Sequence, residues 1–327
     1  MKALQVHHYG GDDAIQLDEI NRPDPMHGEV RVRVEASGIS FVDMLIARGG
    51  YQIRLAPPFI PGSEFSGIVD AVGRGATTDL KVGDHVCGTG RGVWAQYLCL
   101  AANQLHPIPN NSDMVEAAAL PVSFGTALYG LRERAHLIPG ETLLVLGAAG
   151  GVGYAAVQMG KALGARVIAL ASTAEKRRTL QDAGADEVVD SGVDWKDLVK
   201  SLSGRRGVDV VFDPVGNSTT DTAFRTLGWG GRHLMVGFAG GEIPLLKANL
   251  TIVKGASLVG VDYRKFGERN PGHRIRLERE VLAMWRDGKL KPLVAQTVPL
   301  DHFDMALKQA QNRATVGRVV LTIGQPR

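Results

Sequence analysis

The sequence predicts an α/β fold in which a doubly wound parallel sheet is joined to a second, barrel-like β domain. From residue 141 onward, short apolar runs alternate with segments of helical period, which is typical of a parallel sheet covered by helices. Before residue 116, short strands of alternating polarity are separated by turn clusters, as in barrel-like β domains. A glycine-dense turn, residues 147–153, joins the first buried strand to the first helix of the α/β part.

The bulk composition is that of a soluble globular protein. The 327 residues are 44% hydrophobic and 22% charged, enough for one large domain or two ordinary ones. The net charge is only +3 and no basic run stands out, so we expect no nucleic-acid partner. Because no apolar stretch is long enough to cross a membrane and the N-terminus has no signal core, we expect a cytoplasmic protein without a membrane partner.

The first part of the chain reads as β structure. Residues 2–6 alternate in polarity, and Val30, Val32 and Val34 alternate with charged residues, which leaves one face for a core. Turn clusters follow at residues 10–13, 22–25, 57–58 and 81–84, and residues 41–48 form an expected short helix. The two cysteines, Cys87 and Cys99, are too few for a zinc knuckle or a disulfide scaffold.

The stretch 141–172 reads as strand, glycine turn, helix and strand. Apolar residues recur after the turn at helical spacing, and Gly164 is placed to end that helix. This is the βαβ (Rossmann) unit that holds a dinucleotide pyrophosphate at a helix N-terminus. The motif is A-x-G-x-x-G, at Ala148, Gly150 and Gly153. The alternative is a glycine turn that only lets the helix pack close to the strand.

The remaining elements complete two expected domains. We expect strands near 187–189, 208–212, 233–237 and 256–261, with helices over 174–183 and 195–202 and another ending at 227. Helices over 274–286 and 301–311 and a strand over 317–323 follow, and this last strand is expected to return to the β domain. The domains are therefore 123–262 for the nucleotide, and 1–122 with 263–327 for a β-barrel-like catalytic domain.

The residues after the second strand favour NADPH. NAD-binding units place a carboxylate about 20 residues past the glycines, where it binds the ribose 2′-hydroxyl. Here that position is Ser172, with Lys176 and Arg177 one helical turn later. A 2′-phosphate would be repelled by a carboxylate and attracted by Lys176. The alternative is that the two cations only form a solvated helix face.

Across nearly its whole length the chain resembles the zinc-free NADPH:quinone oxidoreductase branch of the medium-chain dehydrogenase/reductase superfamily. The segments that carry the resemblance are 34–40, 61–67, 82–86, 146–153, 213–216 and 236–238. The resemblance implies a Rossmann domain beside a chaperonin-10-like β-barrel. In the alcohol-dehydrogenase branch, Cys and His zinc ligands stand where this chain has Ser40 and Ser63, and hydroxyls are poor zinc ligands. We therefore expect no metal, and hydride transfer from NADPH to a small quinone or α,β-unsaturated carbonyl acceptor.

The resemblance also implies site residues. The catalytic candidates are Ser40, Asp43 and Tyr51. In mitochondrial enoyl-thioester reductases a tyrosine eight residues after an aspartate is the proton donor, and Tyr51 stands in that relation to Asp43. Alternatively, Tyr51 only packs on the β domain, and Asp43 orders the short helix. The cofactor candidates, from the nicotinamide ribose to the phosphates, are Thr126, Ala149, Gly150, Gly151, Val152, Ser172, Lys176, Ser191, Phe238 and Arg313.

Two other functions stay open at this stage. One is an enoyl-thioester (acyl-CoA) reductase that uses Tyr51, and the other is a non-catalytic NADPH-binding protein, because a fold alone does not prove activity. Relatives of this kind usually form dimers through the last strand of the nucleotide domain, which implies a homodimer through residues 257–261.

Overall fold

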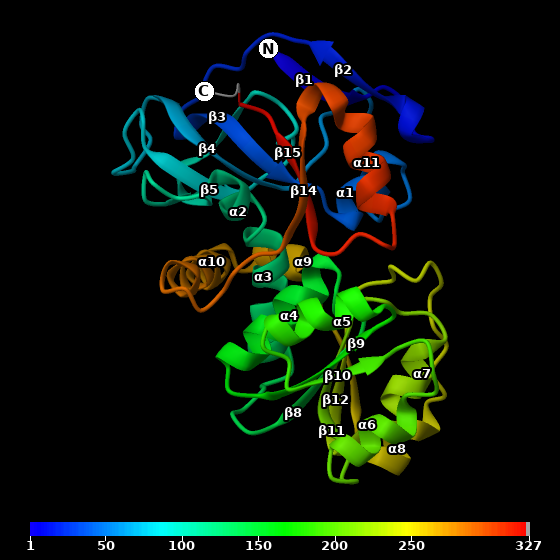
Figure 1. Cartoon of the computed structure of the whole chain (residues 1–327). Coiled ribbons are helices and arrows are strands. Elements are labelled where there is room, and N and C mark those ends of the chain that lie inside the picture. The colour runs from blue at the N-terminus through cyan, green and yellow to red at the C-terminus, as the bar shows by residue number, and fades with distance from the viewer. Residues whose placement is uncertain (325–327) are drawn as a thin grey trace. The chain divides into compact units, whose positions relative to one another are not determined.

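The computed structural model describes residues 1–324, which form two compact units (Figure 1). One unit combines Met1–Val122 with the described chain from Pro292 on, and the other is Ser123–Lys291. The first is built on an antiparallel sheet with one parallel pair, and the second on a six-stranded parallel sheet. The predicted fold class is confirmed.

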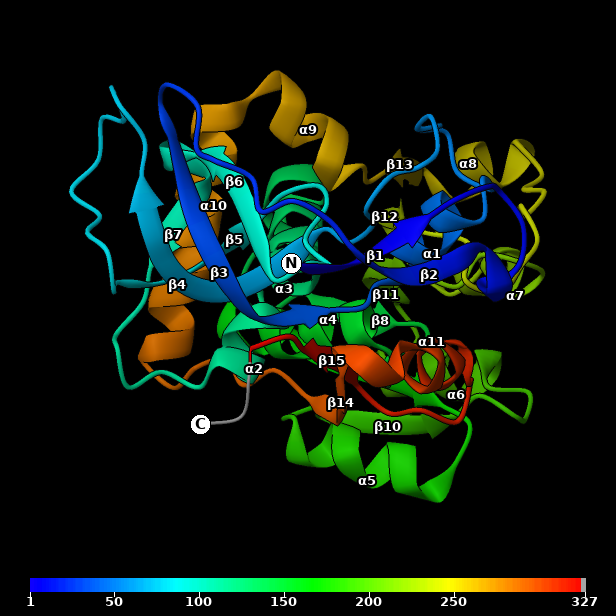
Figure 2. The ribbon, with the colours of Figure 1, turned by 90° about the horizontal axis from the view of Figure 1, so that it is seen from above.

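The first unit is a curved sheet in the order β14-β15-β3-β4-β5-β7, with β6 paired to β3. Val30, Val32 and Val34 of β3 are fully buried, as their alternation predicted. The helix α11 packs on β14 and β15 (Figures 1 and 2). The elements are β1 (Lys2–Val6), β2 (Ile15–Glu19), β3 (Glu29–Gly38), α1 (Phe41–Ala47), β4 (Glu64–Val72), β5 (His85–Thr89), β6 (Tyr97–Ala101), β7 (Leu105–Pro107), α2 (Met114–Ala118), β14 (Val294–Pro299), α11 (Phe303–Gln311) and β15 (Arg318–Thr322), with single 3-10 turns at Asp12–Ala14, Ala102–Gln104 and Leu300–His302.

The second unit is a parallel sheet in the order β10-β9-β8-β11-β12-β13. Helices α4 and α5 pack against β8, β9 and β10, and α7 and α8 against β12 (Figure 1). The elements are α3 (Pro121–Leu128, which begins at the end of the first unit), a π-helix η3 (Tyr129–Arg134), β8 (Thr142–Val145), α4 (Gly151–Ala162), β9 (Arg166–Ala171), α5 (Ala174–Asp182), β10 (Glu187–Asp190), α6 (Lys196–Leu202), β11 (Val208–Asp213), α7 (Thr219–Phe224), β12 (Leu227–Met235), α8 (Asn249–Lys254), β13 (Ser257–Gly260), α9 (Tyr263–Arg269) and α10 (Pro271–Arg286).

The strand order places a topological switch point between β8 and β11. The chain runs from β8 to β9 and β10 on one side, then returns to β11 on the other side of β8. In doubly wound sheets, ligands bind at such a point, outside the carboxyl ends of the strands. The turn that follows β8 is the glycine turn identified from the sequence.

The second domain boundary differs from the expected one. We expected the nucleotide domain to end at residue 262, but the compact unit continues to Lys291. The reason is packing: the Tyr129 and Phe266 rings stack with centroids 4.3 Å apart, and Arg132 and Glu280 form an ion pair at 2.5 Å. These contacts hold α9 and α10 on the parallel-sheet unit. Residues 325–327, which complete the expected β domain, lie outside the described range.

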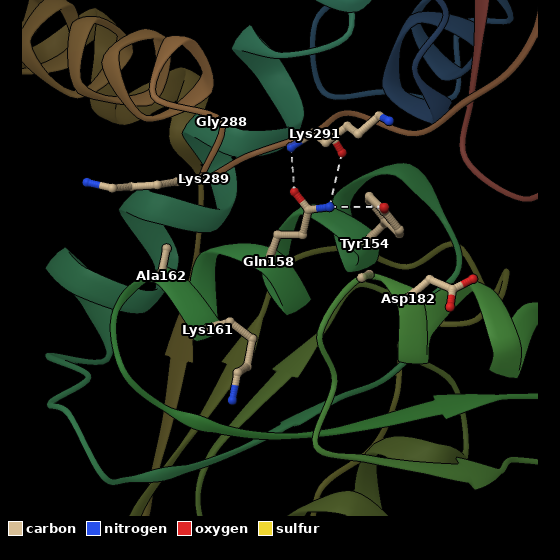
Figure 3. Close-up of a pocket in the computed structure, with 9 residues that line it drawn as sticks. Tyr154, Gln158, Lys161, Ala162, Asp182, Gly288, Lys289 and Lys291 are labelled. Atoms are coloured by element: carbon tan, nitrogen blue, oxygen red, sulfur yellow. Dashed lines mark hydrogen bonds between the residues drawn. The ribbon is translucent and has the colours of Figure 1, made fainter.

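Gln158 fixes the end of the second unit to α4. Its amide nitrogen donates to the Lys291 carbonyl at 3.0 Å, and its amide oxygen accepts from the Lys291 N–H at 2.7 Å. The same amide nitrogen also donates to the Tyr154 hydroxyl at 3.0 Å (Figure 3). One buried side chain thus ties the last residue of the unit to the helix that follows the glycine turn.

The closing strand behaves as predicted. β15 pairs antiparallel with β3 and parallel with β14, so it returns to the first unit. Within residues 1–324, no helix is both long enough and apolar enough to span a membrane.

Candidate functional site

The glycine turn leaves the start of α4 open. Gly150 is the N-cap residue of α4, and no side chain caps that end, so the amides of Gly151 and Val152 are not engaged by a capping side chain. A Cβ on Gly150 would meet only the Gly147 carbonyl, at 3.5 Å, whereas a Cβ on Gly153 would lie 2.3 Å from the same oxygen. The turn and the helix are therefore packed closely enough to exclude a methyl group at Gly153, while Gly150 is exposed. This cradle fits a pyrophosphate.

Asp213 organises the loop beside this cradle. Its carboxylate accepts hydrogen bonds from the amides of Val215 and Gly216, both at 2.9 Å, and from the hydroxyl of Thr220 at 2.8 Å. The His233 imidazole lies 3.1 Å from the same carboxylate, and both side chains are fully buried. Burial favours a higher pKa for Asp213, but the hydrogen bond and charge of His233 outweigh it, and the pKa lies below its ordinary value. Asp213 is a structural anion.

The loops after β8, β11 and β12 meet at this edge. A Cβ on Gly147 would lie 2.7 Å from a Val215 methyl, and a Cβ on Gly216 would lie 2.9 Å from the Phe238 ring. The Phe238 ring packs on Gly216. Because the side chain is 43% exposed, the ring is still accessible to a ligand. The structure therefore brings the predicted residue Phe238 near the glycine turn through Val215 and Gly216. Thr126 is half-buried in α3, beside Gly125, against which the Tyr263 hydroxyl packs.

The ends of β9 and β10 carry the predicted phosphate residues. Asp190 pairs in register with Ala171, and the Ser191 amide donates to the Ala171 carbonyl at 3.1 Å. Ser172 follows β9 and is exposed, as is Ser191. Thr173 caps α5 by accepting from the Lys176 amide at 3.2 Å, which places Lys176 in the first turn of that helix. Ser172, Lys176 and Ser191 thus lie at one corner of the sheet.

A carboxylate at this corner, that of Asp190, was not predicted from the sequence. The Asp190 side chain forms an ion pair with Arg177 at 2.8 Å. Arg177, the second cation expected to attract the 2′-phosphate, is therefore paired with a carboxylate of the neighbouring strand. Asp190 directly precedes Ser191 in the sequence, so its position was known. Its closeness to Arg177 could be inferred only once β10 was known to pair with β9.

In the first unit, Ser40 and Asp43 form a capping box at the start of α1. The Asp43 amide donates to the Ser40 hydroxyl at 3.0 Å, and the Ser40 amide donates to the Asp43 carboxylate at 2.8 Å. Both side chains are buried, and burial raises the pKa of Asp43 above its ordinary value, against hydrogen bonds from Ser40 and Ser63. Asp43 therefore helps to order the start of the short helix, and its catalytic role stays a prediction.

A buried ion pair that the sequence analysis missed lies beside this box. The fully buried Glu64 carboxylate accepts hydrogen bonds from the Arg318 guanidinium and from the Val122 amide, the latter at 2.8 Å. Burial raises the pKa of Glu64, the Arg318 charge opposes this, and the nearby Asp43 carboxylate adds to the rise. Glu64 lies in the segment 61–67 that carried the family resemblance, and Glu64 and Arg318 each begin an otherwise mostly apolar strand, which was the available signal.

Tyr51 and Arg313 also belong to the first unit. Tyr51 is half-buried in a bend after α1, and Arg313 is exposed in the turn after α11. The other cofactor candidates all belong to the second unit. Their predicted roles beside the cofactor and the acceptor therefore stay predictions.

Two family models match the chain. One, described as the alcohol dehydrogenase GroES-like domain, covers residues 26–110, and the other, described as zinc-binding dehydrogenase, covers residues 151–274. The quinone oxidoreductase-like protein 2 homolog of Nematostella vectensis is 37% identical over 96% of this chain and 87% of its own length. Quinone oxidoreductase-like protein 2 of Bos taurus is 38% identical over 94% and 88%, respectively.

This chain belongs to the quinone oxidoreductase branch of the medium-chain dehydrogenase/reductase family. Among solved structures it is similar to the Escherichia coli quinone oxidoreductase complexed with NADPH, with a TM-score of 0.90 and 28% identity over 99% of this chain and 100% of that one. It is also similar to the CurK enoyl reductase, with a TM-score of 0.89 and 28% identity over 99% of both chains. The family assignment makes the chain an oxidoreductase, and its parallel-sheet unit is the family's fold for a nicotinamide cofactor.

The metal ligands of the alcohol-dehydrogenase branch have no counterpart at Ser40 and Ser63. Within residues 1–324, no group of three or more His, Cys, Asp or Glu side chains is arranged to hold a metal ion. The polar groups near Ser40 are instead engaged with one another, in the capping box and in the Glu64–Arg318 pair.

A pocket of about 400 Å³ lies beside α4 in the second unit (Figure 3). It is lined by Tyr154 and Gln158, by the last turns of α4 and α5, and by Gly288, Lys289 and Lys291 after α10. Figure 3 shows the ammonium groups of Lys161, Lys289 and Lys291 pointing away from one another. Lys161 is paired with Asp186 at 2.7 Å. The pocket is therefore not a convergent anion site.

Proposed function

We propose that this chain is an NADPH-dependent reductase that acts on a small quinone or α,β-unsaturated carbonyl compound without a metal ion. The observation that carries this is the corner at the ends of β9 and β10. There, Ser172, Lys176 and Ser191 stand beside an uncapped glycine cradle, and Ser172 occupies the position at which a carboxylate would favour NADH. The names of the relatives, and the NADPH in a solved neighbour, support it.

The cofactor would be held mainly by the second unit. The turn from Ala149 to Val152 would bind the pyrophosphate through its amides, and Ser172, Lys176 and Ser191 would bind the 2′-phosphate. Thr126 and Phe238 would contact the nicotinamide half, and Arg313 would reach a phosphate from the first unit. The accessible Phe238 ring, held on Gly216 by the Asp213 network, supports the first of these contacts.

The chain's own residues must position the acceptor and supply a proton. The nicotinamide, when bound, supplies the hydride. An electron-poor quinone or enone needs no Lewis acid, which agrees with hydroxyls at Ser40 and Ser63. Burial keeps the Asp43 carboxyl engaged with Ser40, so its role is to fix the start of α1. The Tyr51 hydroxyl is the proposed proton donor.

Turnover with two acceptor classes tests this function. NADPH oxidation would be followed with a benzoquinone and with an α,β-unsaturated ketone, with and without a chelator. We expect turnover with at least one acceptor and no effect of the chelator. No turnover with either class, in the presence of measured NADPH binding, would instead favour the non-catalytic binding protein.

Reduction of an enoyl thioester is the second candidate, favoured by Tyr51 and by the similarity to an enoyl reductase. If Tyr51 donates the proton, Tyr51→Phe should lower the rate with a crotonyl thioester by at least about tenfold. Tyr97→Phe is a matched control, because Tyr97 is a half-buried ring of β6 stacked with Arg22. Equal rates for the two variants would remove Tyr51 from the chemistry.

We also propose a homodimer formed through β13. This strand is the last in the order of the parallel sheet and carries Leu258, which is 47% exposed. Trp229 of β12 and Ile252 of α8 lie nearby in the same part of the unit and are 82% and 80% exposed. An open strand edge bordered by apolar side chains supports pairing with a second copy.

A further inference from the structure

The ion pair between Arg177 and Asp190 stands where cofactor specificity is set. One Asp190 oxygen lies 2.8 Å from an Arg177 nitrogen, and the other accepts from the Gly192 amide at 2.8 Å. Arg177 and Asp190 keep 28% and 37% of their side-chain surface exposed. Because Asp190 pairs in register with Ala171, its carboxylate lies at the carboxyl end of the strand beside β9. A ligand bound at the carboxyl end of β9 would therefore interact electrostatically with both Asp190 and Arg177.

The two charges favour different nucleotides. A carboxylate can accept a hydrogen bond from a ribose 2′-hydroxyl and repels a 2′-phosphate, whereas a guanidinium attracts the phosphate. The usual acid is absent at Ser172, but Asp190 supplies an acid one strand further out. With Arg177 bound to it, this acid is largely neutralised.

We propose that Arg177 and Asp190 form a specificity-determining pair, in which Asp190 weakens binding of the 2′-phosphate and Arg177 offsets that effect. The inference rests on the proposed use of NADPH for the identity of the nucleotide. It deepens the proposed function by naming two residues on adjacent elements, one of them at the end of β10, that set the preference. Lys176, directly before Arg177 in the first turn of α5, supplies a second positive charge.

Two substitutions have opposite expected effects. Asp190→Asn removes the repelling charge and releases Arg177, so binding of NADPH should tighten about fivefold, which is typical of a partly exposed charge. Arg177→Gln removes a cation and exposes the carboxylate, so binding of NADPH should weaken about tenfold. NADH, which lacks the phosphate, should change less than about twofold in both variants. The double variant should lie between the single ones.

A purely structural ion pair between α5 and β10 predicts a different result. In that case each variant would be less stable than the wild type, and its affinities for NADPH and NADH would fall to the same extent. Asp186→Asn is the matched control, since Asp186 directly precedes β10, at the opposite end of that strand from Asp190, and is paired with Lys161 at 2.7 Å. It removes a similarly paired carboxylate but should leave the ratio of the two affinities unchanged.

Calorimetric titration of NADPH, NADH, 2′,5′-ADP and 5′-AMP into the wild type and the four variants tests the pair. This readout needs no acceptor, so absence of quinone turnover would refute the proposed reaction and leave the binding test intact. Opposite shifts for Asp190→Asn and Arg177→Gln, seen with NADPH and 2′,5′-ADP only, would support the pair. Parallel shifts with all four nucleotides, or shifts equal to those of Asp186→Asn, would overturn it.

Discussion

The Asp43 amide donates to the Ser40 hydroxyl at 3.0 Å while the Ser40 amide donates to the Asp43 carboxylate at 2.8 Å. Each side chain thus accepts a hydrogen bond from the backbone N–H of the other residue at the first turn of α1. Ser40, which the family resemblance places at a zinc-ligand position of the alcohol-dehydrogenase branch, serves here as a helix cap. The carboxylate that could have been a proton donor holds the start of the segment that leads to Tyr51.

Loss of this cap should cost stability. Asp43→Ala removes a capping interaction and leaves the Ser40 amide without its acceptor, so the free energy of unfolding should fall by about 1–2 kcal/mol. Urea denaturation measures the change. Asp79→Ala, at an exposed carboxylate, should alter stability by less than about 0.5 kcal/mol. Full stability of Asp43→Ala together with lost turnover would assign Asp43 to acid–base chemistry instead.

The pair of Glu64 and Arg318 should be strongly coupled. Arg318→Met leaves a fully buried carboxylate without its countercharge, which typically costs about 3–5 kcal/mol. Glu64→Gln in the same chain removes that charge, so the double variant should be more stable than the sum of the two single losses predicts. A double-mutant cycle by chemical denaturation measures the coupling, and additive losses would show that the two side chains act independently.

Local patterns in the sequence predicted most of the fold. The valines of β3, the glycine turn and the alternation of strands and helices are set by residues a few positions apart, and each is found where it was expected. Ser40 and Asp43, the two residues of the capping box, are three positions apart, so this local pattern could be recognised in the same way. The phosphate corner was partly predicted, because Ser172 and Lys176 follow β9 directly.

Contacts across long sequence separations could not be predicted. Glu64 and Arg318 are 254 residues apart, so neither residue identifies the other until β4 and β15 both pair with β3. The boundary at Lys291 depends on Gln158, which lies 133 residues earlier in the chain. Asp190 likewise meets Arg177 only because β10 lies beside β9. In each case the missing information was a pairing between elements, not a residue type.

The stabilising effect of Asp213 should depend on pH in a defined direction. Its pKa in the folded state lies below the ordinary value of 3.8, so the native state binds fewer protons than the unfolded state in that range. The contribution is fully present above the ordinary pKa and is lost as the pH falls through the lower folded value. Asp213→Asn should cost about 3 kcal/mol at pH 7.

The stability difference between wild type and Asp213→Asn should therefore shrink as the pH falls below the ordinary pKa of 3.8. Urea titrations across this range measure it. Asp221→Asn is the control, because Asp221 forms a surface pair with Arg225 at 2.7 Å and should cost less than about 1 kcal/mol. A difference that grows toward acid pH would contradict the lowered pKa.

A charge on the edge strand should dissociate the proposed dimer. Leu258→Glu would place a carboxylate on the open edge of β13, where a second copy would bury it without a partner. Light scattering after size exclusion, at micromolar concentration, should give a dimer for the wild type and a monomer for the variant. Val82→Glu alters a 67% exposed side chain in the other unit and should leave the dimer intact. A monomeric wild type would refute assembly through β13.

The contact between Gly153 and the glycine turn predicts a defect in nucleotide binding. A methyl group at Gly153 would lie 2.3 Å from the Gly147 carbonyl and 2.9 Å from the Ala148 Cα, both backbone atoms that cannot rotate away. Gly153→Ala must therefore push α4 from the turn, which should cost about 1–3 kcal/mol of stability. The substitution should also weaken the binding of NADPH at least about tenfold, because the amides of Gly151 and Val152 would no longer both point at the pyrophosphate.

Gly272 provides the matched control for this substitution. It also lies in the first turn of a helix, α10, but a Cβ there would meet nothing within 4 Å. Gly272→Ala should be neutral or slightly stabilising, since alanine is the better helix former, and should leave NADPH affinity unchanged. If Gly153→Ala binds NADPH as tightly as Gly272→Ala does, the close approach of turn and helix serves packing alone, and the pyrophosphate must be held elsewhere.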